Sequence, residues 1–183
     1  MPYTVLPASS ESGAALYQVQ VTTRSPMGAI VYETGGILVD SGWLRIIGSG
    51  CEEMTRSLPS WNKDMMGDDL SAYLVADDVL GGFFAINGGA FGDELGSLYY
   101  LPYDALGWEP LGLSYSQFIA WSVSDNLYNF YGADRFSDWE RRKDLITPDQ
   151  CYSFYPFLWT KEGSIQTSSS KPIPASEAIK LKL

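Results

Sequence analysis

The chain of 183 residues contains no histidine and only two cysteines, Cys51 and Cys151. Ser-His-Asp and Cys-His catalysis and histidine-ligated zinc are therefore excluded, and two cysteines cannot build a tetrahedral cysteine-rich zinc site. We expect no disulfide between cysteines so far apart in a chain of this size, and expect both to be free and partly buried. The glycine-rich segments also lack the Lys-Ser or Lys-Thr pair of a phosphate-binding loop. No catalytic residue, metal or cofactor is predicted from these patterns.

Long apolar runs are missing as well. No segment approaches the roughly 20 apolar residues that a membrane-spanning helix needs, and the start, MPYTVLPASS, lacks the features of a signal peptide. We therefore expect a cytoplasmic protein with no membrane association. A hydrophobic share of 45% excludes a largely disordered chain. The length suits one globular domain over 1–183, with an irregular lead-in over 1–13 and a polar link near 163–171.

Positive charge is absent from the middle of the chain. There is no Lys or Arg between Lys63 and Arg135, whereas many aspartates and glutamates fall in that interval. The net charge of −10 argues against binding nucleic acid, which needs basic surface. The acidity has two interpretations that stay open here: a surface that aids solubility, or a docking face for a basic protein partner.

The centre of the predicted fold is the stretch from Ser71 to Tyr103. Three short apolar and aromatic runs, Tyr73–Ala76, Phe83–Ile86 and Leu98–Leu101, are separated by glycine-containing turns. Runs of this length and composition favour strands over helices, so we predict a three-stranded antiparallel meander. The central run is apolar on both faces, and flanking helices should therefore cover both sides of the sheet.

The flanking segments predict the remaining elements of an α+β fold. Ile37–Asp40 and Leu44–Ile47 indicate a hairpin that joins the meander. Cys51–Leu70 shows no sustained periodicity of apolar residues and is predicted to be a long surface loop. Ala14–Thr23 fits both a helical stripe and the alternation of a strand, and we favour the helix. Further helices are predicted at Pro26–Glu33, Tyr115–Ser124, Asp125–Tyr131, from Ser137 through Lys143, and in the C-terminal tail. Cys151–Trp159 is interrupted by Pro156, which favours an edge strand or an extended segment.

Several long segments also carry a family resemblance. In chain order they are LYQVQVTTRSPMGAIVYETGGILVDSGWLRIIGSG, RSLPSWN, LVADDVLGGFFAINGGAFG, GLSYSQFIAW and SFYPFLWTKEG. They closely resemble the bacterial domain of unknown function numbered 2625, which implies no particular activity. More distantly, LVADDVLGGFFAI with the following Ser-x-x-Gln-Phe-Ile helix is similar to the SUKH superfamily of α+β proteins. Many of those are immunity proteins that neutralise secreted toxins, so this resemblance implies a basic toxin domain as partner.

Four acidic residues form the best candidate site: Asp77, Asp78, Asp93 and Glu94. Aspartate next to glycine in a turn usually accepts hydrogen bonds from the backbone, so these residues have a purely structural interpretation. They could instead form an interface with a basic partner, or a catalytic or metal-binding pair. The interface would include Trp61, which could alternatively pin the predicted loop onto the core.

Two functions from different classes follow from these residues. The first, which we favour, is a binding module that docks a basic protein through an acidic face, as an immunity or antitoxin protein does. The alternative is a carboxylate-dependent hydrolase, glycosidase-like or metal-assisted, that uses Asp77, Asp78 or Asp93 beside Trp43 or Trp61. Two facing carboxylates in a cleft would favour the hydrolase. A shallow acidic surface would favour the binding module.

Overall fold

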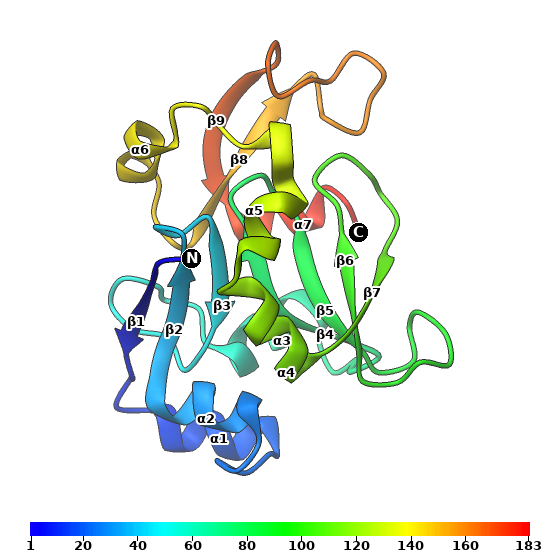
Figure 1. Ribbon diagram of the computed structural model, residues 1–183. Coiled ribbons are helices and arrows are strands. Elements are labelled where there is room, and N and C mark those ends of the chain that lie inside the picture. Colours follow the sequence, from blue (N-terminus) through cyan, green and yellow to red (C-terminus); the bar gives the residue numbers. More distant parts are fainter.

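The computed structural model describes all residues, 1–183, and confirms an α+β fold (Figure 1). A seven-stranded antiparallel sheet is accompanied by a separate two-stranded hairpin. The large sheet contains β1 (Tyr3–Pro7), β2 (Thr34–Val39), β3 (Leu44–Ile47), β4 (Ala72–Asp78), β5 (Phe83–Asn87), β6 (Ser97–Leu101) and β7 (Glu109–Ser114); the hairpin contains β8 (Gln150–Tyr155) and β9 (Ser169–Pro174). Each strand of the large sheet pairs with the next one along the chain, so the predicted meander and hairpin are confirmed as its centre.

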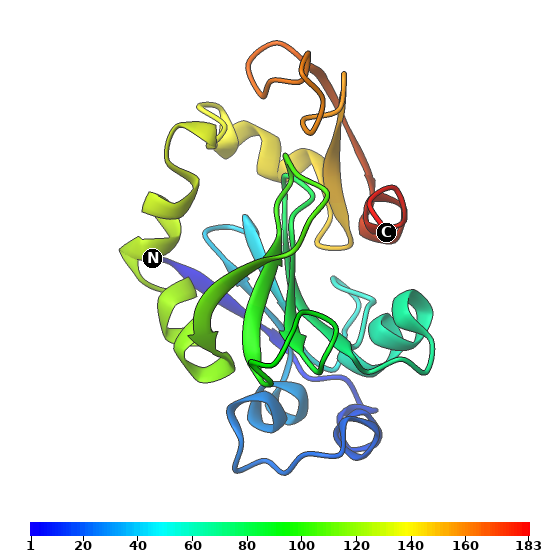
Figure 2. The same ribbon diagram turned by 90° about the vertical axis from the view of Figure 1, so that its right-hand side faces the viewer.

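Helices cover both faces of the sheet, as its two-sided apolar centre predicts. They are α1 (Ser12–Val19), α2 (Pro26–Glu33), α3 (Leu58–Met66), α4 (Tyr115–Ser122), α5 (Asp125–Tyr131), α6 (Trp139–Arg142) and α7 (Ala175–Lys180). Figure 2 shows α4 and α5 on one side of the sheet, α3 and α7 on the other, and α1 and α2 at one end. No helix combines the length and the apolar character needed to cross a membrane.

The helix starts follow from capping residues that are visible in the sequence. Ser25 accepts a hydrogen bond from the backbone N–H of Gly28 at the start of α2. Ser114 and Gln117 form a reciprocal capping box at the start of α4. Phe118 on this helix is fully buried against Phe84 of β5, with 5.0 Å between the ring centroids. The predicted packing of α4 on the central strands is therefore confirmed.

Three predictions about irregular segments are wrong. Within Cys51–Leu70 the helix α3 begins after a capping box formed by Ser57 and Ser60. Within the lead-in, β1 pairs with β2 along the sheet edge. The sequence of β1 shows little alternation of apolar and polar residues, because only Leu6 of this strand is buried. The polar link near 163–171 ends in β9, which pairs with β8. Polar residues suit β9 because most of its side chains are exposed.

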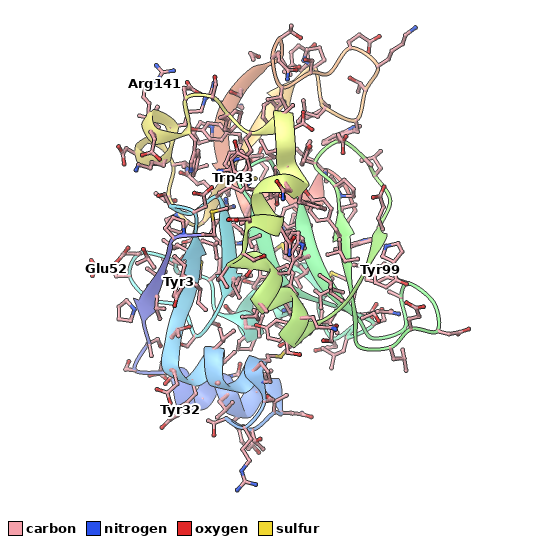
Figure 3. The ribbon with its side chains drawn as sticks, in the orientation of Figure 1. Tyr3, Tyr32, Trp43, Glu52, Tyr99 and Arg141 are labelled. Carbon is pink, nitrogen blue, oxygen red and sulfur yellow. The ribbon has the colours of Figure 1, made fainter.

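The aromatic core between the sheet and α5–α6 centres on Trp43, which is fully buried (Figure 3). The rings of Tyr131, Phe136 and Trp139 meet it edge to face at centroid distances of 5.4, 5.7 and 5.2 Å. Such contacts add to the stabilisation from burial. Both cysteines are free, as predicted, and Cys151 is buried.

Candidate functional site

Asp77 and Asp78 end strand β4, and the structure buries both side chains completely. The prediction that they belong to an exposed acidic face is therefore wrong. Successive side chains of a strand point to opposite faces of the sheet. The partners described below cover each carboxyl group, so neither reaches solvent.

Asp77 lies between two arginines. Arg45 Nε on β3 donates to Asp77 Oδ1 at 2.9 Å, and Arg56 Nη1 donates to Asp77 Oδ2 at 2.6 Å. Arg56 Nε also reaches Asp149 Oδ1, just before β8, at 3.0 Å. Burial lowers the pKa of Arg56, but the charges of Asp77 and Asp149 outweigh it and raise that pKa overall. The network thus ties the hairpin segment to the centre of the large sheet.

Asp78 accepts hydrogen bonds from the turn that follows it and from two tyrosines. The backbone N–H groups of Leu80 and Gly82 each donate to Oδ1 at 2.9 Å. The hydroxyl groups of Tyr100 and Tyr131 donate to Oδ2 at 2.7 and 2.8 Å. Burial and the neighbouring Asp78 raise the pKa of both tyrosines well above the ordinary value. The structural interpretation of Asp78, an aspartate that organises its turn, is confirmed.

These networks leave Asp77 and Asp78 unavailable for the hydrolase chemistry considered from the sequence. Asp77 and Asp78 are saturated with protein partners and have no exposed surface through which to meet a substrate. Trp43 and Trp61, their proposed aromatic neighbours, are buried as well. The structure also contains no group of three Asp, Glu or Cys side chains placed to hold a metal ion.

Trp61 lies inside the molecule, on α3, and is only 3% exposed. The guanidinium group of Arg56 lies 4.6 Å from its ring centroid, which is a cation–π distance. The prediction that Trp61 contributes to an interface is therefore wrong. Its other interpretation, an anchor for the segment on the core, is confirmed.

Asp93 and Glu94 do reach solvent, on the loop between β5 and β6. The buried Asn87 holds this loop in shape: its Nδ2 donates to the carbonyls of Gly92 and Glu94, both at 3.0 Å. Its Oδ1 accepts from the N–H groups of Gly89 and Phe91 at 2.8 and 3.1 Å. The sequence predicts only a glycine-containing turn at this place, and it does not reveal that the Asn87 amide pairs with four backbone groups of the loop.

A second acidic loop lies beside this one. The carbonyl of Ser71 accepts hydrogen bonds from the N–H groups of Gly88 and Ala90, which joins the segment after α3 to the β5–β6 loop. Leu70 and Leu95 on these loops are 65% and 70% exposed. We call this surface the acidic tip; it comprises Asp68, Asp69, Leu70, Asp93, Glu94 and Leu95.

The acidic tip combines negative charge with exposed apolar side chains. Lys63 pairs with Asp68, and no other salt bridge involves a residue of the tip. Asp69 accepts from Ser71 at 2.8 Å, and this hydrogen bonding lowers the pKa of Asp69. The tip therefore carries uncompensated charge at neutral pH. Of the five residues predicted to form the interface, the structure places only Asp93 and Glu94 on it.

Comparison with known proteins places the chain in a family. A model described as "Protein of unknown function DUF2625" matches residues 1–178. The chain belongs to this family. It is 42% identical over 164 residues to the uncharacterized protein YbfG of Escherichia coli strain K12, covering 89% of this chain and 76% of that protein. An uncharacterized protein of Haemophilus influenzae is 39% identical over 153 residues, covering 81% of this chain and 67% of that one. The DUF2625 resemblance seen in the sequence is thereby confirmed.

Proposed function

We propose that this DUF2625 protein is a binding module that docks a basic protein partner through the acidic tip. The observation that carries the proposal is the fixed presentation of Asp93, Glu94 and Leu95 by the buried Asn87. A preformed loop loses little conformational entropy when it binds, so more of the contact energy contributes to affinity.

The composition of the tip favours a protein partner. Its carboxylates can steer a basic surface toward the tip and fix its orientation. Leu70 and Leu95 supply exposed apolar area that a partner could desolvate. The net charge of −10 means that the molecule as a whole also attracts a basic partner.

The resemblance to the SUKH superfamily suggests the class of partner. If the chain acts as those immunity proteins do, the partner is a basic toxin domain, and the module neutralises it by occupying its basic surface. The support is the LVADDVLGGFFAI segment and the helix that starts at Ser114. The genes next to this one should be inspected first: if one of them encodes a large secreted protein with a basic C-terminal domain, that domain is the first partner to express and test.

The test compares two charge reversals of equal size. Asp93→Lys with Glu94→Lys alters the tip, whereas Glu52→Lys with Glu53→Lys alters two adjacent exposed glutamates outside it. Figure 3 labels Glu52 on the side of the molecule away from the β5–β6 loop. Each double variant changes two acidic residues to lysine and so shifts the net charge from −10 to −6. Both sets of side chains are exposed, so neither variant should lose stability.

Binding to the purified basic domain should be measured at low and at moderate salt. The tip variant should associate at least about tenfold more slowly than the wild type, because it loses the charge that steers encounter. The variant at Glu52 and Glu53 should associate at nearly the wild-type rate. Added salt should reduce the difference in association rate between the tip variant and the wild type. Equal association rates for the two variants at every salt concentration would overturn the proposal.

A further inference from the structure

An open groove lies beside the acidic tip and shares Asp68 and Leu70 with it. Its walls are the end of α1, one side of α3, the turn after α3, and Tyr73 of β4. Figure 2 shows α1, at one end of the sheet, next to α3. We call this the α1–α3 groove. Its volume of about 440 Å³ admits a long side chain of another protein.

Several polar groups in the α1–α3 groove are available to a partner. Gln18 and Gln20, at the end of α1, are exposed, and each carries an amide oxygen that can accept a hydrogen bond. Burial alone raises the pKa of Tyr73 to about 12, since its hydroxyl group has no hydrogen-bond partner. The buried Asn62 fixes the floor: its Nδ2 donates to the carbonyl of Leu74 at 2.8 Å, and its Oδ1 accepts from the N–H of Leu74 at 2.7 Å. The groove is therefore preformed.

The charge at the mouth of the groove is a carboxylate. Asp68 is the only acidic residue of the lining, and its side chain is 93% exposed. Lys63, the only basic residue of the lining, pairs with it across the mouth. An ion pair between two exposed side chains contributes little free energy, so a basic group of a partner can replace Lys63 at this carboxylate. Charge complementarity thus favours a basic side chain as the occupant.

We propose that the α1–α3 groove receives an arginine side chain of the basic partner, with its guanidinium group on Asp68 and Tyr73 and its methylene groups against Val19 and Leu70. This inference rests on the docking function proposed above and names the group of the partner that would be bound.

Arginine suits the groove better than lysine does. Its planar guanidinium group carries five N–H donors, so it can reach the carboxylate, the phenol oxygen and a glutamine oxygen together. It also stacks on an aromatic ring such as that of Tyr73, and it is more weakly hydrated than an ammonium group. Arginine is among the side chains that contribute most to binding when they enter a pocket of an interface.

Three blocked tripeptides test the proposal without the partner. They are acetyl-Gly-X-Gly-amides in which X is arginine, lysine or citrulline, the uncharged isostere of arginine. In a ¹H–¹⁵N NMR titration, the arginine peptide should shift the amide signals of Gln18, Gln20 and Leu70, with a dissociation constant in the low millimolar range. The lysine peptide should bind about threefold more weakly. The citrulline peptide should bind about fivefold more weakly, because it keeps the shape and loses the charge.

Variants of the two charged lining residues separate the groove from the general charge of the molecule. Asp68→Asn should weaken binding of the arginine peptide about threefold, whereas Asp64→Asn, at an exposed aspartate of α3 outside the lining, should bind as the wild type does. Lys63→Met should tighten binding about twofold, because it removes the competitor for Asp68. Lys161→Met removes an exposed lysine elsewhere and is its matched control.

A variant of Tyr73 tests the role of the hydroxyl group. Tyr73→Phe keeps the ring and should weaken binding of the arginine peptide about threefold, with little effect on the citrulline peptide. This hydroxyl group has no partner within the chain, so its loss should not lower stability. Circular dichroism of each variant shows that it is folded, and the exposed positions of Asp68 and Lys63 keep the test decisive if Tyr73→Phe is not.

Three results would overturn the inference: no shift of the groove signals at about 20 mM arginine peptide, equal binding of the arginine and citrulline peptides, or equal effects of Asp68→Asn and Asp64→Asn. Asp93→Lys with Glu94→Lys lies outside the groove lining and should leave peptide binding within about twofold at moderate salt. If this double variant slows docking of the basic domain but the arginine peptide does not bind, the groove inference alone fails. If the peptide binds as expected but docking is unaffected by the double variant, the proposed function alone fails.

Discussion

Arg45 and Asp77 lie opposite each other on the neighbouring strands β3 and β4, and Arg45 Nε donates to Asp77 Oδ1 at 2.9 Å. Both side chains are 1% exposed. Arg56 shares the same carboxylate from the other side. Asp77→Asn keeps the shape but leaves two buried guanidinium groups without their common counter-ion. We expect it to lower the free energy of unfolding by about 3 to 5 kcal/mol, measured by urea denaturation.

Two further variants control this prediction. Arg45→Met should cost less than Asp77→Asn, because Arg56 still neutralises Asp77 and an apolar side chain fills much of the same volume. Asp93→Asn changes an exposed aspartate and should alter stability by no more than about 0.5 kcal/mol. If Asp77→Asn and Asp93→Asn unfold at the same urea concentration, the buried network does not hold the fold together.

Asn87 gives a second prediction, about the shape of the acidic tip. Asn87→Ala removes the partner of four backbone groups in the β5–β6 loop. The expected cost is about 1 to 3 kcal/mol, together with faster hydrogen exchange at the amides of Gly89 and Phe91. Asn129→Ala changes an exposed asparagine on α5 and should leave those exchange rates unchanged. Unchanged protection in Asn87→Ala would show that the loop is held by other contacts.

The centre of the fold could be predicted from local patterns. Tyr73–Ala76 and Phe83–Ile86 are short runs with glycine between them, and only a strand pairing buries both faces of such runs. The same pattern could not reveal β1, because an edge strand needs only one buried side chain, here Leu6. It could not reveal α3 either, since this helix buries only Leu58, Trp61 and Asn62.

The candidate site was harder to predict because charge in a sequence does not reveal burial. Asp77 and Asp78 look like Asp93 and Glu94 in the printed chain. They differ in the partners that distant segments bring to them, Arg56 for Asp77 and Tyr131 for Asp78. Arg45 is the one partner of Asp77 that strand pairing within the sheet itself supplies. The remaining partners are set by tertiary contacts that no local pattern specifies.

The last prediction concerns the dependence of stability on pH. Burial lowers the pKa of Lys182 from 10.5 to about 8 in the folded chain. Between these two values the unfolded chain binds more protons than the folded one, so the free energy of unfolding contributed by Lys182 increases as pH rises through this window. The slope is at most about 1.4 kcal/mol per pH unit. Lys182→Met lacks the titrating group and should not show this increase.

The quantity to measure is therefore the stability of the wild type minus that of Lys182→Met, by urea denaturation from pH 7.5 to pH 10.5. Subtracting the stability of the variant cancels the contribution of the other groups that titrate in the same range.

The groups that face Lys182 from its neighbours are Asp78, Asp104, Tyr103, Tyr152 and Cys151. Burial raises the pKa of Cys151 to about 12 and also raises the pKa values of Tyr103 and Tyr152, so these three keep their protons over most of the window. The difference should rise with pH for Lys182→Met and stay flat for Lys180→Met, which changes an exposed lysine two residues earlier. A flat difference for both would mean that the amine of Lys182 is solvated in the folded chain.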